Sequence, residues 1–240
     1  MKGFYEFSMP MHIISLVLIF VFFGILFIIN IKHPKKINRY WDYAVGLFVL
    51  AAYSFVFLET ITNSSIENLL TQSLLPWHNF TGLIVIVGSL SIMLPRKLKI
   101  RNYALALTLL MSMGLIYGMF DTTINYIRVI NNNYLEREFW LFFYQFILII
   151  YCFNSLQIGE LKISWKEMLF TIITMFIIYG VSLVINLNLN LSLFGVGKYF
   201  YNLIQYPNSI YCLVDFGSII IFVLLSYLVF VFPIKKLKKQ

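Results

Sequence analysis

Residues 166–187 read KEMLFTIITMFIIYGVSLVINL, an apolar stretch long enough to cross a lipid bilayer as a helix. A bilayer core about 30 Å thick needs roughly 20 apolar residues at a rise of about 1.5 Å per residue. Six further stretches of this kind occur in the 240-residue chain, which is 60% hydrophobic and only 12% charged. Ordinary soluble domains are about 25% charged. We therefore predict an all-α, polytopic membrane protein with one seven-helix domain over residues 1–240 and spans at about 10–31, 41–60, 76–94, 103–121, 139–158, 166–187 and 210–233.

Basic residues are concentrated in alternate connections between these spans. The segments after spans one, three and five, together with the C-terminal tail, hold 14 of the 18 Lys and Arg residues. Because such loops stay cytoplasmic, we expect the N-terminus outside and the C-terminus inside the cell membrane. The net charge of +8 then reflects topology and attraction to anionic membrane lipid. A nucleic-acid partner is not expected, since the charges are dispersed over four short segments.

Cysteines and small residues have structural interpretations. Cys152 lies within the fifth span and Cys212 near the outer end of the seventh, too far apart in depth for a disulfide. Both are expected to be buried apolar residues. Neither cysteine has a metal-ligand spacing, and no cofactor is indicated. Gly114 and Gly118 are four residues apart in the fourth span, a spacing that permits close helix packing.

The outer segment after the sixth span has a different pattern. From Asn186 to Leu193, polar residues alternate with leucine, which favours an extended, half-buried segment over a helix. Residues 194–201 are rich in aromatics and glycine. We expect residues 188–209 to form an outer flap or interfacial lid, and the alternative is an aromatic-belt loop with no ligand role.

Seven polar side chains, one from each span, lie near the predicted outer face. Asp215 and Gln145 are roughly 8–9 Å inside their spans at the helical rise. A carboxylate at such a depth costs up to about 3 kcal/mol unless it faces a partner or water. A shared depth makes all seven candidates for one outward-facing polar pocket: His12, Glu59, His78, Asp121, Gln145, Asn186 and Asp215.

His78 belongs to the most distinctive short string, Leu75-Pro76-Trp77-His78. Proline starts helices well, so Pro76 is expected to place His78 in the first turn of a helix, near the mouth of the bundle. Imidazole exchanges protons near neutral pH, and a carboxylate such as Glu59 or Asp215 could orient it as a general base. The alternative is an interfacial histidine beside a belt tryptophan.

Four segments of the chain resemble the YwaF-like bacterial integral membrane proteins. They are residues 7–12 (FSMPMH), the Leu75–His78 string, Asn186, and residues 206–211 (YPNSIY). The resemblance covers essentially the whole chain and implies the same seven-helix layout. Animal relatives of the family are acyltransferases that move fatty acyl chains onto ether phospholipids. The resemblance therefore implies a lipid-facing acyl-transfer site near His78, and the residue usage is also that of an AT-rich bacterial genome.

The chain departs from the family where the chemistry is expected. The family string reads approximately Leu-Pro-Leu-His-Leu-Cys, and the position of its cysteine is Phe80 here. Tyr144 and Gln145 occupy the neighbourhood of a family histidine in span five. A nucleophilic mechanism needs a thiol or hydroxyl activated by a base, so the cysteine-dependent reaction should be absent.

Several functions follow from these residues as hypotheses. The first is an outward pocket around His12, Glu59, His78 and Asp215 that binds a lipid or a small amphipathic ligand. The second is lipid acyl transfer with His78 as general base. A transporter would use Glu59 and Asp215 as protonatable carriers, but the inner halves of the spans hold little polar beyond Asn154, which argues against a through-pathway. A subunit that binds another membrane protein is the remaining hypothesis.

Overall fold

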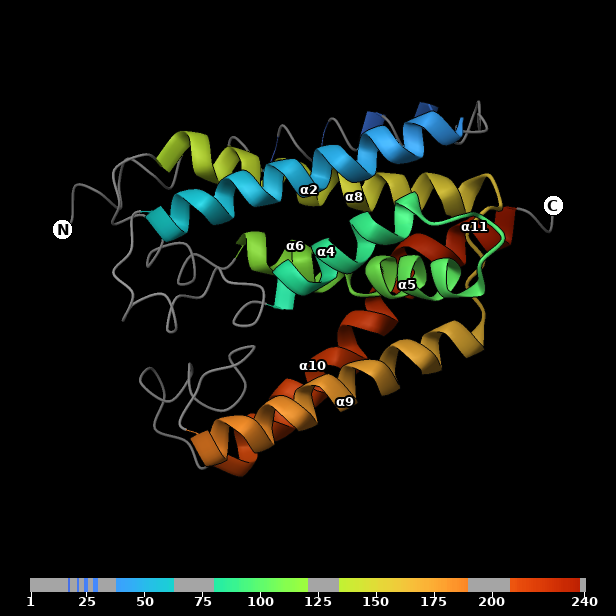
Figure 1. Ribbon diagram of the computed structural model, residues 1–240. Coiled ribbons are helices and arrows are strands. Elements are labelled where there is room, and N and C mark those ends of the chain that lie inside the picture. Colours follow the sequence, from blue (N-terminus) through green and yellow to red (C-terminus); the bar gives the residue numbers. More distant parts are fainter. Residues whose placement is uncertain are drawn as a thin grey trace. The chain divides into compact units, whose positions relative to one another are not determined.

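The computed structural model describes residues 17, 21, 24–25, 28–29, 38–62, 80–120, 134–189 and 208–237. The chain divides into two units, Met1–Ile37 and Asn38–Gln240. The described residues of the first unit are helical, and the second unit is built from helices (Figure 1). No strand occurs in the described ranges, which confirms the predicted all-α class.

The helices of the second unit fall on the predicted apolar stretches. Two of them, Trp165–Asn186 and Phe216–Lys236, are long and apolar enough to cross a membrane, and Thr81–Met93 and Phe143–Gln157 are shorter apolar helices. The elements are α2 (Arg39–Thr62), α4 (Phe80–Met93), α5 (Lys99–Leu110), α6 (Ser112–Phe120), α8 (Tyr134–Gln157), α9 (Trp165–Leu189), α10 (Asn208–Ser226), the π-helix η2 (Tyr227–Val231) and α11 (Phe232–Leu237).

The stretch predicted as one helix over 103–121 is two helices, α5 and α6, separated by a turn at Met111. The turn leaves the Met113 N–H outside the helical ladder, and this group donates to the Ser226 hydroxyl of α10 at 3.1 Å. Ser112 donates its hydroxyl to the Leu109 carbonyl at 2.6 Å. Side-chain hydroxyls thus satisfy the backbone groups that the break releases, as an apolar surrounding requires.

The extended segment predicted from Asn186 is wrong for its first residues, because α9 continues as a helix to Leu189. Asn188 donates its side-chain amide to the Val184 carbonyl at 2.7 Å, one turn back along the helix. This local hydrogen bond lets asparagine remain helical despite the period-two pattern. Residues 190–207, which hold most of the predicted flap, lie outside the described residues.

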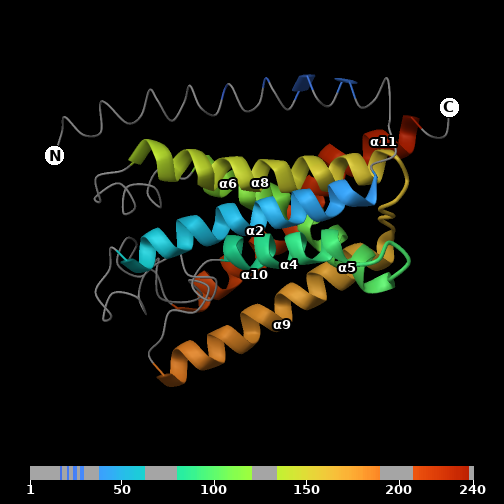
Figure 2. The ribbon, with the colours of Figure 1, turned by 45° about the horizontal axis from the view of Figure 1, so that its top comes forward.

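Helix α5 packs against α4 and α8 on one side and against α9 and α10 on the other (Figures 1 and 2). Helix α2 packs in turn against α4 and α8, and α9 packs against α10. A Cβ atom at Gly46 would lie 2.9 Å from the Ser89 carbonyl oxygen, so α2 and α4 approach closely there. A Cβ atom at Gly114 would lie 3.1 Å from the Phe222 ring, which confirms the predicted packing role of this glycine.

Helix α9 buries several polar side chains and exposes many apolar ones. Thr171, Ser182 and Asn186 are buried together with Met175, at intervals of about one or two helical turns. The opposite face carries large exposed hydrophobics: Leu169, Phe170, Ile173, Ile177, Val181 and Val184. This arrangement is the inverse of a helix on the surface of a soluble protein.

The close approach at Gly46 predicts that the two glycines of α2 and α9 respond differently to the same change. Gly46→Ala should lower the free energy of unfolding by roughly 1–3 kcal/mol, since the new methyl meets backbone that cannot move aside. Gly180→Ala is the control, because a Cβ atom added there would meet nothing within 4 Å, and it should be neutral or stabilising by up to about 1 kcal/mol. Thermal unfolding of both variants in detergent checks this, and equal shifts would contradict it.

Candidate functional site

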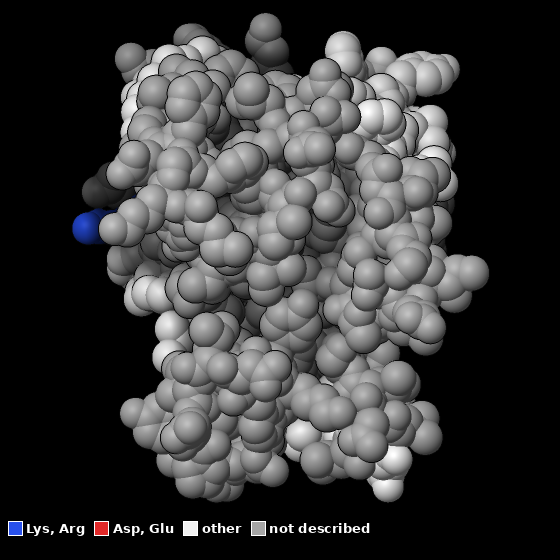
Figure 3. Space-filling model, turned by 90° about the vertical axis from the view of Figure 1, so that its left-hand side faces the viewer, with Lys and Arg blue, Asp and Glu red and all other residues white. Residues whose placement is uncertain are grey.

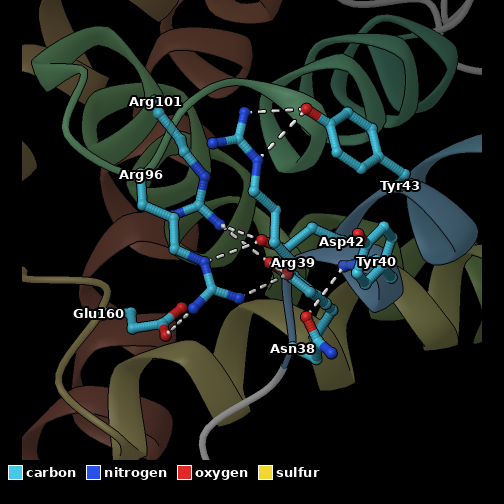
Figure 4. A network of polar contacts seen from close by, with 9 residues as sticks. Asn38, Arg39, Tyr40, Asp42, Tyr43, Arg96, Arg101 and Glu160 are labelled. Atoms are coloured by element: carbon cyan, nitrogen blue, oxygen red, sulfur yellow. Dashed lines mark hydrogen bonds and ion pairs between the residues drawn. The ribbon is translucent and has the colours of Figure 1, made fainter.

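A network of buried and partly buried charged side chains (Figure 4) lies where the start of α2 meets the α4–α5 and α8–α9 connections, at one end of the second unit (Figure 1). Asp42 lies in the first turn of α2, where the helix dipole favours a negative charge. Arg96 belongs to the connection between α4 and α5, and Glu160 to the connection between α8 and α9. We call this end, where the three segments meet, the charged end.

Arg96 joins the two acidic residues. Its Nε atom donates to Asp42 Oδ2 at 2.9 Å and its Nη2 atom donates to Asp42 Oδ1 at 3.1 Å, a two-pronged pairing that fixes both planar groups. Its Nη1 atom donates to Glu160 Oε1. The hydrogen bonds with Asp42 raise the pKa of the Arg96 guanidinium above its ordinary value, so Arg96 remains charged.

Arg101 extends the network into the bundle. Its side chain is only 2% exposed, and its Nη2 atom donates to the Tyr151 hydroxyl of α8 at 2.8 Å. Tyr151 in turn donates to Asp42 Oδ1 at 2.7 Å, and Arg101 Nη2 lies 3.8 Å from Asp42 Oδ2. Two arginines and two carboxylates balance in charge, which is the condition for keeping such groups away from water.

Local backbone features place Glu160 at this point. Gly159 follows the last turn of α8 with φ of 85°, a left-handed conformation that glycine adopts without strain. The chain then turns, and the Leu161 N–H donates to the Ser155 carbonyl at 2.9 Å. Asn102 of α5 fixes the same connection with two hydrogen bonds. Its side-chain amide donates to the Lys162 carbonyl at 2.9 Å and accepts from the Lys162 N–H at 2.8 Å.

Polar atoms without a hydrogen-bond partner lie beside this network. In the described part of the chain they include a donor on α5 and acceptors in the last turns of α8 and the connection after it. Burial without a partner costs roughly 1–3 kcal/mol per group, so such atoms are uncommon in folded proteins. These atoms are Arg101 Nε, Asn154 Oδ1, Ser155 Oγ, Gln157 Oε1 and Glu160 Oε2.

Most of the predicted outer pocket falls where side chains are not described. His12, His78 and Asp121 lie outside the described residues, whereas Glu59 and Asp215 are helical residues of α2 and α10 whose side chains are not described. Figure 3 views the molecule from the end where α2 finishes and α4 begins, and most of the atoms in this view belong to residues outside the described ranges.

Gln145 and Asn186 are the predicted site residues whose side chains the structure describes, and both are buried. Gln145 lies on α8 beside Tyr144, whose ring meets the Tyr53 ring of α2 edge to face with centroids 5.8 Å apart. Asn186 lies on α9, which packs against α5 and α10, whereas α8 packs against α2, α4, α5 and α6. The structure therefore places Gln145 and Asn186 on helices that pack on different sides of α5 (Figure 1).

The charged network was not predicted from the sequence. Arg96 and Arg101 served only to orient the spans, and Asn154 was taken as almost the only polar residue of the inner halves. The structure corrects this, because Asp42, Arg101 and Tyr151 are buried as well. Acidic residues at the basic ends of two helical segments, Asp42 and Glu160, were the available signal, since opposite charges at one end of a bundle favour ion pairs.

The described residues contain no group of three or more His, Cys, Asp or Glu side chains that would hold a metal ion. Cys152 is a free, buried thiol, as predicted, while the side chain of Cys212 is not described. No family model, curated protein or solved structure matches the chain.

Proposed function

We propose that the chain is a multi-pass protein of the cell membrane, with seven spans and the charged end on the cytoplasmic side. The observation that carries this proposal is the inverted pattern of α9, which buries Thr171, Ser182 and Asn186 and exposes isoleucine and valine. In lipid, polar groups must be satisfied inside the protein and apolar groups can face outward without cost. The exposed apolar faces of α2 and α10 have the same character.

Exposed basic residues support the proposed orientation. The start of α2, the α4–α5 connection, the α8–α9 connection and α11 lie at the charged end (Figures 1 and 2). Cytoplasmic surfaces of membrane proteins carry such an excess of Lys and Arg, and they meet anionic lipid headgroups. Among the residues that the structure describes, the exposed basic ones at this end are Arg39, Lys97, Lys99, Lys162, Lys166, Lys235 and Lys236.

Introducing a lysine on the exposed face of α9 tests whether that face meets lipid or water. Ile177 is 60% exposed, and Ile177→Lys should cost up to about 3 kcal/mol if the face meets lipid, which lowers the yield of membrane-inserted protein. Trp165→Lys is the control, because Trp165 is exposed at the first turn of α9 beside Lys166, where the charge should be tolerated. Immunoblots of membrane fractions measure both, and unchanged insertion of Ile177→Lys would contradict the proposal.

At the opposite, outer end we propose a polar pocket that binds a lipid or a small amphipathic ligand. Its residues are His12, Glu59, His78 and Asp215, with Asp121, Gln145 and Asn186 nearby in depth. The support comes from the sequence, since ionisable groups inside apolar spans are costly unless they face water or a ligand. The resemblance to YwaF-like proteins, whose animal relatives act on phospholipids, favours a lipid as the ligand.

Ligand retention tests this pocket. The double variant His78→Ala with Asp215→Asn should lose lipid species that co-purify with the unchanged protein, because both polar anchors of the pocket are removed. Mass spectrometry of extracts from protein purified in detergent gives the lipid profile, and immunoblots control for membrane abundance. The double variant Lys97→Ala with Lys162→Ala, which changes exposed residues of the charged end, should retain the outer-pocket species. Equal lipid profiles for the unchanged protein and both double variants would contradict the proposed pocket.

A transporter is a second candidate, and one observation now favours it. Asp42, Arg101 and Tyr151 are buried at the charged end, so the structure supplies ionisable groups at the end opposite to the proposed pocket. Polar groups near both ends of a bundle are what a path for a polar solute requires. The inner halves of the spans therefore hold more polar residues than Asn154, and a polar path through the bundle stays a candidate.

A further inference from the structure

The charged network joins segments that are far apart in the chain. Asp42 and Arg96 are separated by 54 positions, Arg96 and Glu160 by 64, and Asp42 and Tyr151 by 109. Through these bonds the starts of α2 and α5, the inner turns of α8 and the entrance to α9 are held against each other (Figure 4). A few side-chain contacts thus close this end of the bundle.

Exposure falls along the network from its edge to its centre. Arg96 is 29% exposed and Glu160 16%, whereas Asp42 and Arg101 are each 2% exposed. The contacts of Arg96 therefore stand between water and the buried part of the network. Removing them would leave Asp42 and Arg101 open to solvent without unpacking the helices, because these contacts come from connections and helix ends.

Polar atoms that have no partner in the closed arrangement occur on Arg101 and in the last turns of α8, between Tyr151 and Glu160 along the chain. Asn154 and Ser155 lie three and four residues after Tyr151, so both lie one turn along α8 on the side that carries Tyr151. Asn154 Oδ1, Ser155 Oγ and Arg101 Nε are buried and unpaired. Each would gain a hydrogen bond if water entered, so hydration offsets part of the cost of opening.

We propose that the Asp42–Arg96–Glu160 network is a gate at the charged end, and that opening it admits water to the polar face of α8. The closed gate is the arrangement in the structure, in which Arg96 bridges both carboxylates. In the open gate Arg96 leaves Asp42, and water reaches Asn154, Ser155 and the Arg101 guanidinium. The gate requires neither the outer pocket nor a bound ligand, and a failed test of that pocket leaves it standing.

Cys152 is a native reporter for this opening. It follows Tyr151 directly on α8 and is fully buried, so a polar maleimide reaches its thiol only when water does. The full chain with Cys212→Ser keeps Cys152 as its single cysteine. The probe is a maleimide that carries a charged sulfonate group, added to membrane vesicles opened on both sides, and intact-protein mass spectrometry gives the labelling rate.

The gate predicts a graded rise in labelling. Arg96→Gln should label Cys152 at least about tenfold faster than the unchanged protein, because it removes the bridging contacts of an ion pair. Asp42→Asn should label at least as fast as Arg96→Gln, since it also weakens the bond from Tyr151. Arg39→Gln changes an exposed arginine of α2, the helix of Asp42, outside the network. Its Cys152 labelling rate should stay within about twofold of the rate in the unchanged protein.

A second thiol separates opening of the gate from general loosening. Ser182 is buried on α9 outside the network, and Ser182→Cys with both native cysteines changed to serine supplies the matched probe. Arg96→Gln should leave labelling at position 182 within about twofold of the rate without it. Equal acceleration at positions 152 and 182 would show loosening of the whole bundle, and an unchanged rate at 152 would show that the network does not close this end. Either result overturns the gate.

Discussion

The Asp42 carboxylate is the group on which the charged end depends, because three donors converge on its two oxygen atoms. It accepts two hydrogen bonds from Arg96 and one from Tyr151, with Arg101 Nη2 within 3.8 Å. A carboxylate that is 2% exposed persists only with such partners, and the buried Arg101 needs the negative charge equally. Removing one member of such a set leaves the others uncompensated, which costs about 3–5 kcal/mol in buried ion pairs.

The faces of the helices follow the same rule as this network, because polar groups are buried with partners and apolar groups are exposed. Thr171, Ser182 and Asn186 of α9 are buried, as are Arg101 of α5 and Tyr151 of α8, while isoleucine, valine and leucine are exposed on α9. The backbone follows the same rule at the break between α5 and α6, where Ser226 accepts the N–H that the turn at Met111 releases. These buried polar groups are thus turned away from the proposed lipid, and a helix lacking internal partners for them would be unstable there.

The sequence alone predicted the helices better than their faces. Apolar length and charged connections located the helical stretches, because hydropathy depends on composition along the chain. Hydropathy carries no information on helix rotation, so Arg101 was interpreted as a loop charge although α5 turns it toward Tyr151. The period-two pattern at Asn186 failed because the helix supplied Asn188 with a carbonyl one turn back. Gln145 and Asn186 are both buried, but the packing of α8 and α9 around α5 was not encoded in either stretch.

Asp42 and Tyr151 act together in the charged network, and a double-mutant cycle measures the energy that couples them. The free energy of unfolding is measured in detergent for Asp42→Asn, Tyr151→Phe and the double variant. Tyr151 donates to Asp42 at 2.7 Å, so the two losses should overlap and the coupling energy should exceed about 1 kcal/mol. Losses that add within about 0.3–0.5 kcal/mol would mean that the two residues act independently, which would contradict a network centred on Asp42.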